Sequence, residues 1–150
     1  MELERTSHCV YKIRYHMVTA VKYRKVLLNK EVEECIRVTM QGITERYEIS
    51  IDEMGFDQNH IHIFCGGKPT VSPMQILNII KSLTARKVFE KFPRLRKDEL
   101  WGGGFWSDGK YIGTVGESAN EETIKEYIRN QSIDKSEMER RTGQLKLFKF

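Results

Sequence analysis

Two histidines occupy alternate positions in the segment DQNHIHI, which spans residues 57–63 and contains His60 and His62. On a β-strand, alternate side chains point to the same face, so both imidazoles could bind one metal ion. Ile61, between them, would then point into the core. The pattern alone leaves two interpretations open, a metal site or two exposed histidines on a strand.

A tyrosine and a glutamine follow near the end of the chain, at Tyr127 and Gln131. Four residues apart, they share one face of a helix, and the glutamine carbonyl oxygen is a suitable neutral ligand for a divalent cation. Ile124 and Ile128 lie on the same stretch. The alternative interpretation is therefore an ordinary amphipathic helix that packs against the core.

The elements that must position these side chains can be predicted from periodicity and capping signals. Ser72, Pro73 and Gln75 have the spacing of a capping box with proline at the first helical position. Strands are expected at about 10–18, 48–54, 60–65 and 105–115, and helices at about 31–47, 73–89 and 121–131.

This order predicts an α+β fold, a ferredoxin-like or RRM-like βαββαβ antiparallel sheet with both helices on one face, followed by a C-terminal helix that carries Tyr127. The opposite face of the sheet would be open for function. In this topology the first and third strands are neighbours, so His60 and His62 should lie beside the outward residues of the first strand, which are Lys12, Arg14 and His16.

Five motifs in order carry a resemblance that extends from about residue 11 to residue 131: VKYRKVL at 21–27, DQNHIHIF at 57–64, IIKSLTARKVF at 79–89, an aromatic glycine segment ending in TVG at 114–116, and EYIRNQ at 126–131. With these motifs the chain resembles the TnpA transposases of small bacterial insertion sequences that move as single-stranded DNA. These enzymes belong to the HUH single-tyrosine nucleases.

The resemblance implies that His60 and His62 are metal ligands, that Gln131 completes the metal site and that Tyr127 is the nucleophile. A phenol, with an ordinary pKa of about 10, is a poor nucleophile at neutral pH unless a metal polarises the phosphate. Magnesium or manganese suits such a site, although two imidazoles would also tolerate zinc. The expected enzyme is a transposase that cleaves and rejoins single-stranded DNA through a 5′-phosphotyrosine intermediate.

The resemblance also implies a homodimer that recognises DNA hairpins at the element ends. Its candidate DNA-binding residues are basic side chains on the first strand and the second helix: Lys12, Arg14, Lys81, Arg86, Lys87 and Lys91. We further hypothesise a hinge at residues 113–120, where Gly113 and Gly116 precede the last helix. The hinge would let Tyr127 act at its own metal site or at that of its partner.

Length and composition fit one domain over residues 1–150, with a core at about 9–131 and a charged tail at 132–150. The chain has no apolar stretch of roughly 20 residues and no signal-peptide pattern at its start. We therefore do not expect a membrane protein, and we expect a cytoplasmic location. Cys9, Cys35 and Cys65 form no metal or disulfide motif and are expected to be buried.

Two alternative functions remain open. A domesticated relative could cleave repeated chromosomal hairpins without moving an element. A noncatalytic RNA-binding module could instead stack bases on aromatic residues of a four-stranded sheet. The net charge of +4, from 25 basic and 21 acidic residues, is compatible with any nucleic acid partner.

Overall fold

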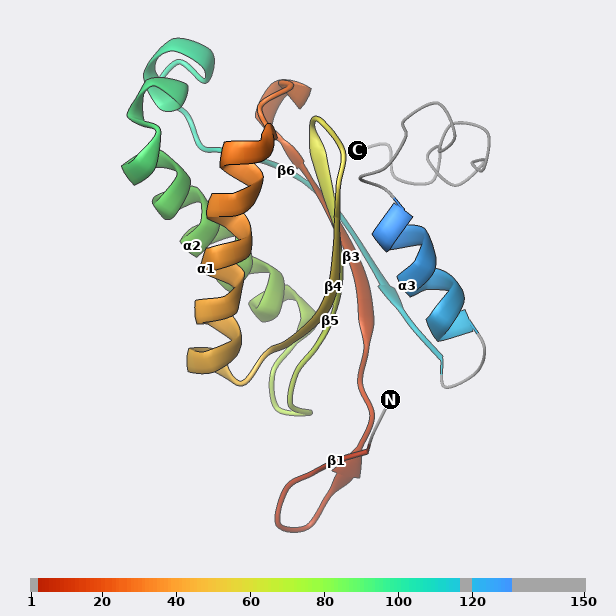
Figure 1. The fold of residues 1–150 in the computed structure, drawn as a ribbon. Coiled ribbons are helices and arrows are strands. Elements are labelled where there is room, and N and C mark those ends of the chain that lie inside the picture. Colours follow the sequence, from red (N-terminus) through yellow and green to blue (C-terminus); the bar gives the residue numbers. More distant parts are fainter. Residues whose placement is uncertain (1–2, 117–119, 131–150) are drawn as a thin grey trace.

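The computed structural model describes residues 3–116 and 120–130, which form a four-stranded sheet with helices on both sides (Figure 1). The sheet contains β3 (Tyr15–Val21), β4 (Ser50–Phe56), β5 (His60–Gly66) and β6 (Trp106–Thr114). The helices are α1 (Lys30–Tyr47), α2 (Pro73–Lys91) and α3 (Asn120–Asn130). Smaller elements are the strands β1 (Glu4–Arg5) and β2 (Val10–Tyr11), the 3-10 turn η1 (Lys22–Arg24) and the π-helical turn η2 (Leu95–Glu99).

The strand order is β4-β5-β3-β6, and every neighbouring pair is antiparallel. This order confirms the predicted α+β sheet, in which the first and third strands of the motif are central neighbours. Figure 1 shows α1 and α2 on one side of the sheet and α3 on the other. The prediction of an open second face is therefore wrong, because α3 covers part of that face.

The strand that was expected at residues 10–18 begins later and extends further, as β3. Val10 and Tyr11 instead pair with Arg5 and Glu4 in a separate hairpin. The alternation of apolar and polar residues ends after residue 17, because every residue from Val18 to Val21 is buried. A central strand that is covered on both faces loses the polar side on which period-two prediction depends.

Helix ends follow the local chemistry that the sequence indicates. The Ser72 side chain accepts a hydrogen bond from the Gln75 backbone N–H, and the Gln75 side chain accepts one from the Ser72 backbone N–H. This confirms the predicted capping box, with Pro73 at the start of α2. Asn29 caps α1 by accepting from the Val32 backbone N–H at 2.9 Å.

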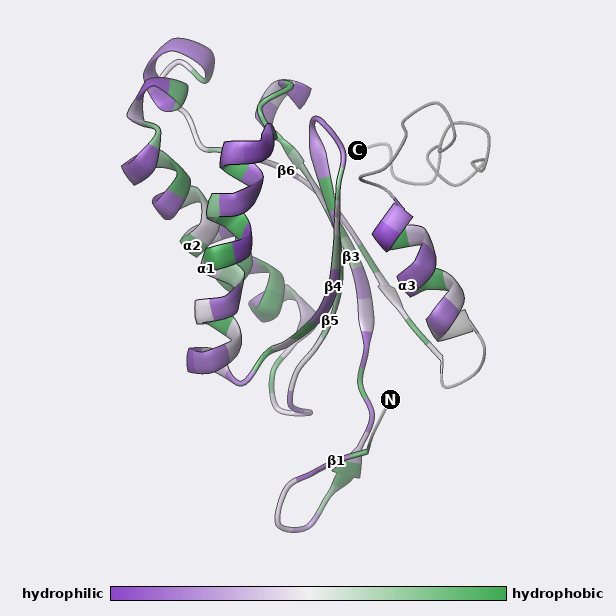
Figure 2. Cartoon of the chain, in the orientation of Figure 1, coloured by the Kyte–Doolittle hydropathy of each residue, from purple (hydrophilic) through white to green (hydrophobic). Residues whose placement is uncertain are grey.

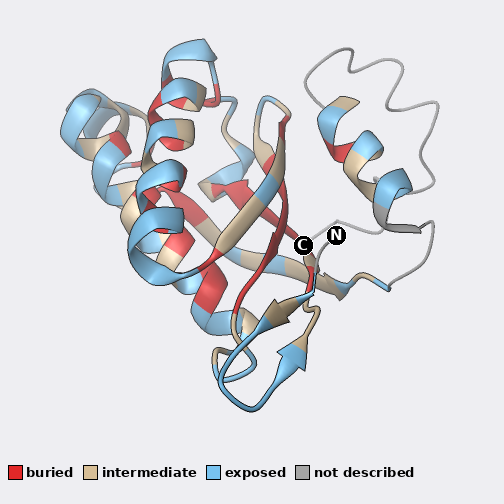
Figure 3. Cartoon of the chain, turned by 60° about the horizontal axis from the view of Figure 1, so that its bottom comes forward, coloured by how far each residue is buried: buried red, intermediate tan, exposed pale blue. Residues whose placement is uncertain are grey.

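The main core lies between the sheet and the pair α1 and α2. Fully buried Met17, Ile61 and Ile63 of the sheet face Ile36 and Ile80 of the helices. Along the helices, apolar and polar residues alternate in bands (Figure 2), and burial is concentrated on the central strand and on the inner sides of α1 and α2 (Figure 3).

Some predictions from the sequence differ from the structure, and others concern residues that the structure does not describe. Cys35 and Cys65 are buried as expected, but Cys9 is exposed because it lies in the small N-terminal hairpin. Gln131 and the charged tail at 132–150 lie outside the described residues. Within residues 3–116 and 120–130, no helix has the length and apolar content needed to cross a membrane.

Candidate active site

The two histidines of the DQNHIHI segment project from one face of β5. Ile61 and Ile63 alternate with them and belong to the core on the side of α1 and α2. His60 and His62 therefore face the side of α3, and their ring centroids lie 5.1 Å apart. The expectation that both imidazoles share one sheet face is borne out by this geometry.

His62 is fully buried and is paired with a third histidine, His16, on the neighbouring strand β3. The His16 Nε2 and His62 Nδ1 atoms lie 3.0 Å apart, at hydrogen-bond distance, and the rings stack with centroids 5.2 Å apart. Burial lowers the pKa of His16 to about 4. Burial, reinforced by His60 and His16, also places the pKa of His62 well below its ordinary value. Both rings are neutral at pH 7, which is the form that binds a metal.

His60 is oriented by the residues just before it in the chain. Its Nδ1 lies 2.8 Å from the Asn59 side-chain oxygen, which can only accept, so Nδ1 carries the proton and donates. Nε2 is then the nitrogen with a lone pair, and it lies 3.9 Å from a carboxylate oxygen of Asp57. Hydrogen bonding at one ring nitrogen commonly sets the other for metal coordination.

Tyr127 lies against His62. Its ring meets that of His62 edge to face, with centroids 5.7 Å apart and an interplanar angle of 82°. Tyr127 comes from α3 and His62 from β5, which are separated in sequence by α2 and β6. The structure thus brings together the candidate nucleophile and the candidate ligands that the sequence singled out.

Side chains besides Tyr127 also hold α3 on the sheet. Ile128 is fully buried. The Lys125 Nζ lies 5.1 Å from the ring centroid of Phe64 on β5. The Arg129 Nη2 lies 3.1 Å from the Glu53 Oε2 on the edge strand β4. Apolar burial and cationic contacts therefore add to the Tyr127 contact in positioning the helix.

The two histidine side chains are suitable ligands for a divalent ion, which would need further ligands besides them. His60 and His62 offer two imidazoles on one face, each with its Nδ1 at hydrogen-bond distance from a neighbouring side chain. In the part of the chain that the structure describes, no cluster of three or more histidine, cysteine, aspartate or glutamate residues could hold a metal. The predicted third ligand, Gln131, follows the last described residue of α3.

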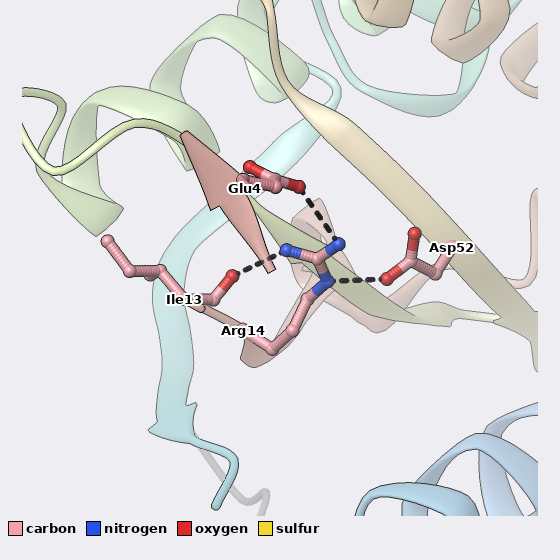
Figure 4. Close-up of polar contacts among 4 residues, drawn as sticks. All are labelled: Glu4, Ile13, Arg14 and Asp52. Atoms are coloured by element: carbon pink, nitrogen blue, oxygen red, sulfur yellow. Dashed lines mark hydrogen bonds and ion pairs between the residues drawn. The ribbon is translucent and has the colours of Figure 1, made fainter. Parts of the chain in front are cut away.

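Arg14 does not lie beside His60 and His62, contrary to expectation, but forms ion pairs with Asp52 and Glu4 (Figure 4). Its Nε lies 2.6 Å from the Asp52 Oδ2, and its Nη2 lies 3.2 Å from the Glu4 Oε1. Arg14 precedes Tyr15, which pairs with Cys65 at the opposite end of β5 from His60. Since Lys12 comes still earlier in the chain, only His16 of the three outward residues reaches the site. The Arg14 guanidinium joins the N-terminal hairpin to β4.

The basic residues of α2 lie on the helix side of the sheet, away from Tyr127. The Lys81 Nζ donates to the Ser107 carbonyl at 2.8 Å, and burial lowers the pKa of this lysine. Arg86 and Lys87 line an open cleft of about 770 Å³ between α1 and α2. Their role in DNA binding, together with that of Lys12, Arg14, Lys81 and Lys91, stays a prediction.

Sequence reasoning assigned no role to His16 or Asn59 at the site. The outward position of His16 on a strand next to β5 could have indicated a role at the site. The register that pairs the two strands and brings His16 to His62 cannot be read from the sequence. The signal for Asn59 was its place directly before His60. Both residues lie at hydrogen-bond distance from the ring nitrogens of the two histidines.

Comparisons with known proteins agree on one family. Residues 9–131 match the family described as IS200-like transposases. The ISDra2 transposase TnpA of Deinococcus radiodurans is 28% identical over 131 residues, covering 87% of this chain and 92% of the relative. The transposase of insertion sequence element IS200 from Salmonella typhimurium is 27% identical over 125 residues, covering 83% of this chain and 80% of the relative.

Solved structures show the same likeness. A crystal structure assigned to a transposase of Deinococcus radiodurans R1 aligns with a TM-score of 0.69 and 27% identity, covering 87% of this chain and 99% of the other. The structure of a REP-associated tyrosine transposase bound to a REP hairpin aligns with a TM-score of 0.54 and 10% identity, covering 83% of this chain and 69% of the other. The second likeness concerns the fold alone.

Proposed function

Because this chain belongs to the family of IS200-like transposases, we propose that it cleaves and rejoins single-stranded DNA with Tyr127 as the nucleophile. The observation that carries the proposal is the contact between the Tyr127 ring and His62, which shares its sheet face with His60. A phenol in contact with one imidazole, which in turn lies next to a second, supplies a nucleophile and metal ligands, as metal-assisted phosphoryl transfer requires.

In the proposed reaction the Tyr127 phenolic oxygen attacks the phosphorus of a DNA phosphodiester. The new oxygen–phosphorus bond forms as the bond to the 3′-oxygen breaks, and the proton lost by the phenol is balanced by the proton gained by the 3′-hydroxyl. The product is a 5′-phosphotyrosine. Because one phosphodiester replaces another, a 3′-hydroxyl from a second strand can reverse the step and rejoin DNA without an external energy source.

His60 and His62 would hold a divalent ion, magnesium or manganese, with Gln131 as a further ligand. When bound, such an ion polarises the scissile phosphate and stabilises charge on the leaving oxygen. The remaining work belongs to the chain itself. His16 and Asn59 keep the two ligand rings oriented through their Nδ1 atoms, and α3 carries Tyr127 to them.

We propose that the partner DNA contains hairpins and that the protein acts as a homodimer. A protein of the same fold was solved with a REP hairpin bound. Excision of an element requires two cuts, and Tyr127 is the one tyrosine within Asn120–Asn130. A second copy of the chain would therefore supply the second nucleophile.

The noncatalytic RNA-binding alternative is disfavoured by the position of α3. Base stacking on a four-stranded sheet needs exposed rings on its outer face. Here α3 covers the part of that face where Phe64 and His62 are fully buried. The helix that blocks this part of a stacking surface also brings Tyr127 to His62, which favours the catalytic interpretation.

Replacing Tyr127 by Phe tests the proposal. The protein is incubated with magnesium and single-stranded fragments of the DNA that flanks its gene, and the covalent adduct is measured on a denaturing gel. We expect Tyr127→Phe to lose the adduct and to keep hairpin binding, because only the nucleophilic oxygen is removed. Tyr111→Phe is the matched control, since the ring of Tyr111 lies 5.8 Å from that of His16. An adduct that persists in Tyr127→Phe would show that another residue is the nucleophile.

A further inference from the structure

Two large aromatic side chains lie together in solvent, away from the Tyr127 site. Tyr23 of η1 is 60% exposed, and Trp101, just after η2, is 68% exposed. Their ring centroids lie 5.3 Å apart with an interplanar angle of 61°. Tyr23 and Trp101 are called the aromatic pair below. Exposed rings of this size at one place indicate a binding surface more than a packing role.

Two lysines flank the aromatic pair. The Lys25 Nζ lies 4.8 Å from the Trp101 ring centroid, and the Lys22 Nζ lies 5.7 Å from that of Tyr23. Lys25 also lies 3.8 Å from a carboxylate oxygen of Glu99, with both side chains partly exposed. The surface therefore combines two π faces with positive charge, which are the two features that bind single-stranded nucleic acid.

The backbone holds these rings in conformations that cost energy. Tyr23, Arg24 and Trp101 have φ values of 59°, 51° and 48°, in the left-handed region that residues with a side chain rarely adopt. Hydrogen bonds fix both segments, from the Lys22 N–H to the Phe105 carbonyl and from the Gly102 N–H to the Arg96 carbonyl, each at 2.8 Å. Strain kept in place to hold apolar rings in water favours a functional role.

The aromatic pair belongs to the end of the sheet where β5 begins. The Val21 N–H donates to the Asn59 carbonyl at 2.8 Å, and the Leu28 N–H donates to the Gln58 carbonyl at 3.0 Å. The segment that carries Tyr23 is thus bonded directly to the turn that precedes His60. Figure 1 shows this turn between β4 and β5 at the same end of the sheet as the segment that follows β3.

We propose that the aromatic pair is a stacking platform for unpaired bases of single-stranded DNA, with Lys22 and Lys25 contacting the adjoining phosphates. This inference rests on the proposed function, because it assumes a single-stranded DNA substrate. Bases on the platform would lie on a strand that enters the Tyr127 site from the His60 end. Stacking recognises any base by its π face, so the platform holds the strand without reading its sequence.

The binding test compares a short oligothymidylate with an abasic oligomer of the same length, which keeps the phosphates and lacks the bases. Trp101→Leu and Tyr23→Leu should each weaken oligothymidylate binding roughly tenfold, as expected for loss of one stacked ring. Trp101→Phe should stay within about threefold of the parent protein. Tyr47→Leu is the control, since Tyr47 is an exposed ring at the end of α1. The abasic oligomer should bind the parent protein and Trp101→Leu equally.

A second measurement uses the parent protein without substitution. The chain has two tryptophans, and because Trp106 is only 7% exposed, quenching by a bound strand reports Trp101. Oligothymidylate should quench the fluorescence, and the abasic oligomer should not. Equal quenching by both oligomers, or unchanged oligothymidylate affinity in Trp101→Leu, would overturn the platform.

The covalent adduct assay on the same proteins separates the two proposals. An adduct in the parent protein, combined with no effect of either leucine variant on oligothymidylate binding, would reject the platform and leave the nucleophile assignment standing. Base-dependent quenching without any adduct would reject the nucleophile and support the platform.

Discussion

His60 and His62 occupy equivalent positions on one face of β5, yet their surroundings differ. His62 lies beneath Tyr127, is fully buried and is hydrogen-bonded to His16. The side chain of His60 keeps 12% exposure at the start of the strand, where Asn59 contacts it. The same residue type thus serves the proposed metal site from two environments, and only one of them is part of the protein interior.

We expect His62→Ala to lower the free energy of unfolding by about 2 kcal/mol or more, because it opens a cavity and leaves the buried His16 ring without its partner. His60→Ala should cost about 1 kcal/mol or less. Both variants should lose the metal-dependent adduct. Urea denaturation in the presence of a chelator measures the difference. Equal losses of stability would show that the His16 contact contributes little.

At the scale of elements, local signals predicted more than long-range ones. The capping box of α2 could be read from Ser72 and Gln75, because its contacts lie within one helical turn. The start of β3 could not be predicted, because Arg14 is held by Asp52 and Glu4 from distant segments. Predicting the contact between His16 and His62 would also have required the register between β3 and β5. The rest of the site was predicted from spacing and resemblance.

Thr84 links α2 to β6 and is fully buried. Its hydroxyl donates to the Ile80 carbonyl at 2.6 Å and accepts from the Trp106 Nε1 at 2.9 Å. Thr84→Val keeps the shape and removes the acceptor of a buried indole N–H, so we expect a loss of about 1–3 kcal/mol in the free energy of unfolding.

Thr39→Val is the matched control for this prediction. Thr39 donates in the same way to the Cys35 carbonyl, at 2.8 Å, from the partly buried side of α1. A helical threonine of this kind contributes little, so we expect a change within about 0.5 kcal/mol. Urea denaturation measures the free energy of unfolding of both variants. Similar losses in the two variants would mean that the contact between Thr84 and the Trp106 indole does not stabilise the packing of α2 on β6.

Over the whole molecule, the sheet separates a large core from a smaller layer that carries the proposed nucleophile. α1 and α2 bury the main core on one face, while α3, which carries Tyr127, lies on the other face (Figure 1). The segment before α3 was expected to be a hinge. Gly113 proves to be part of β6, where it pairs with His16, while Gly116 has open space around its Cα and residues 117–119 lie outside the described part of the chain.

This layering bears on whether Tyr127 acts within one subunit or between two. The contacts that hold α3 come from side chains such as Lys125 on Phe64 and Arg129 on Glu53. In a homodimer an identical sheet offers the same partners, so a helix could dock on either subunit, as in domain swapping. The proposed exchange of DNA ends would use both positions.

Mixing two inactive proteins tests this exchange. One carries His60→Ala and His62→Ala, and the other carries Tyr127→Phe. We expect the mixture to recover adduct formation, because Tyr127 of the first subunit can dock beside the intact histidines of the second. Each protein alone is the control, and heterodimer formation is verified with differently tagged subunits. A verified heterodimer that remains inactive would mean that each tyrosine works only beside the histidines of its own chain, in the arrangement that α3 adopts here.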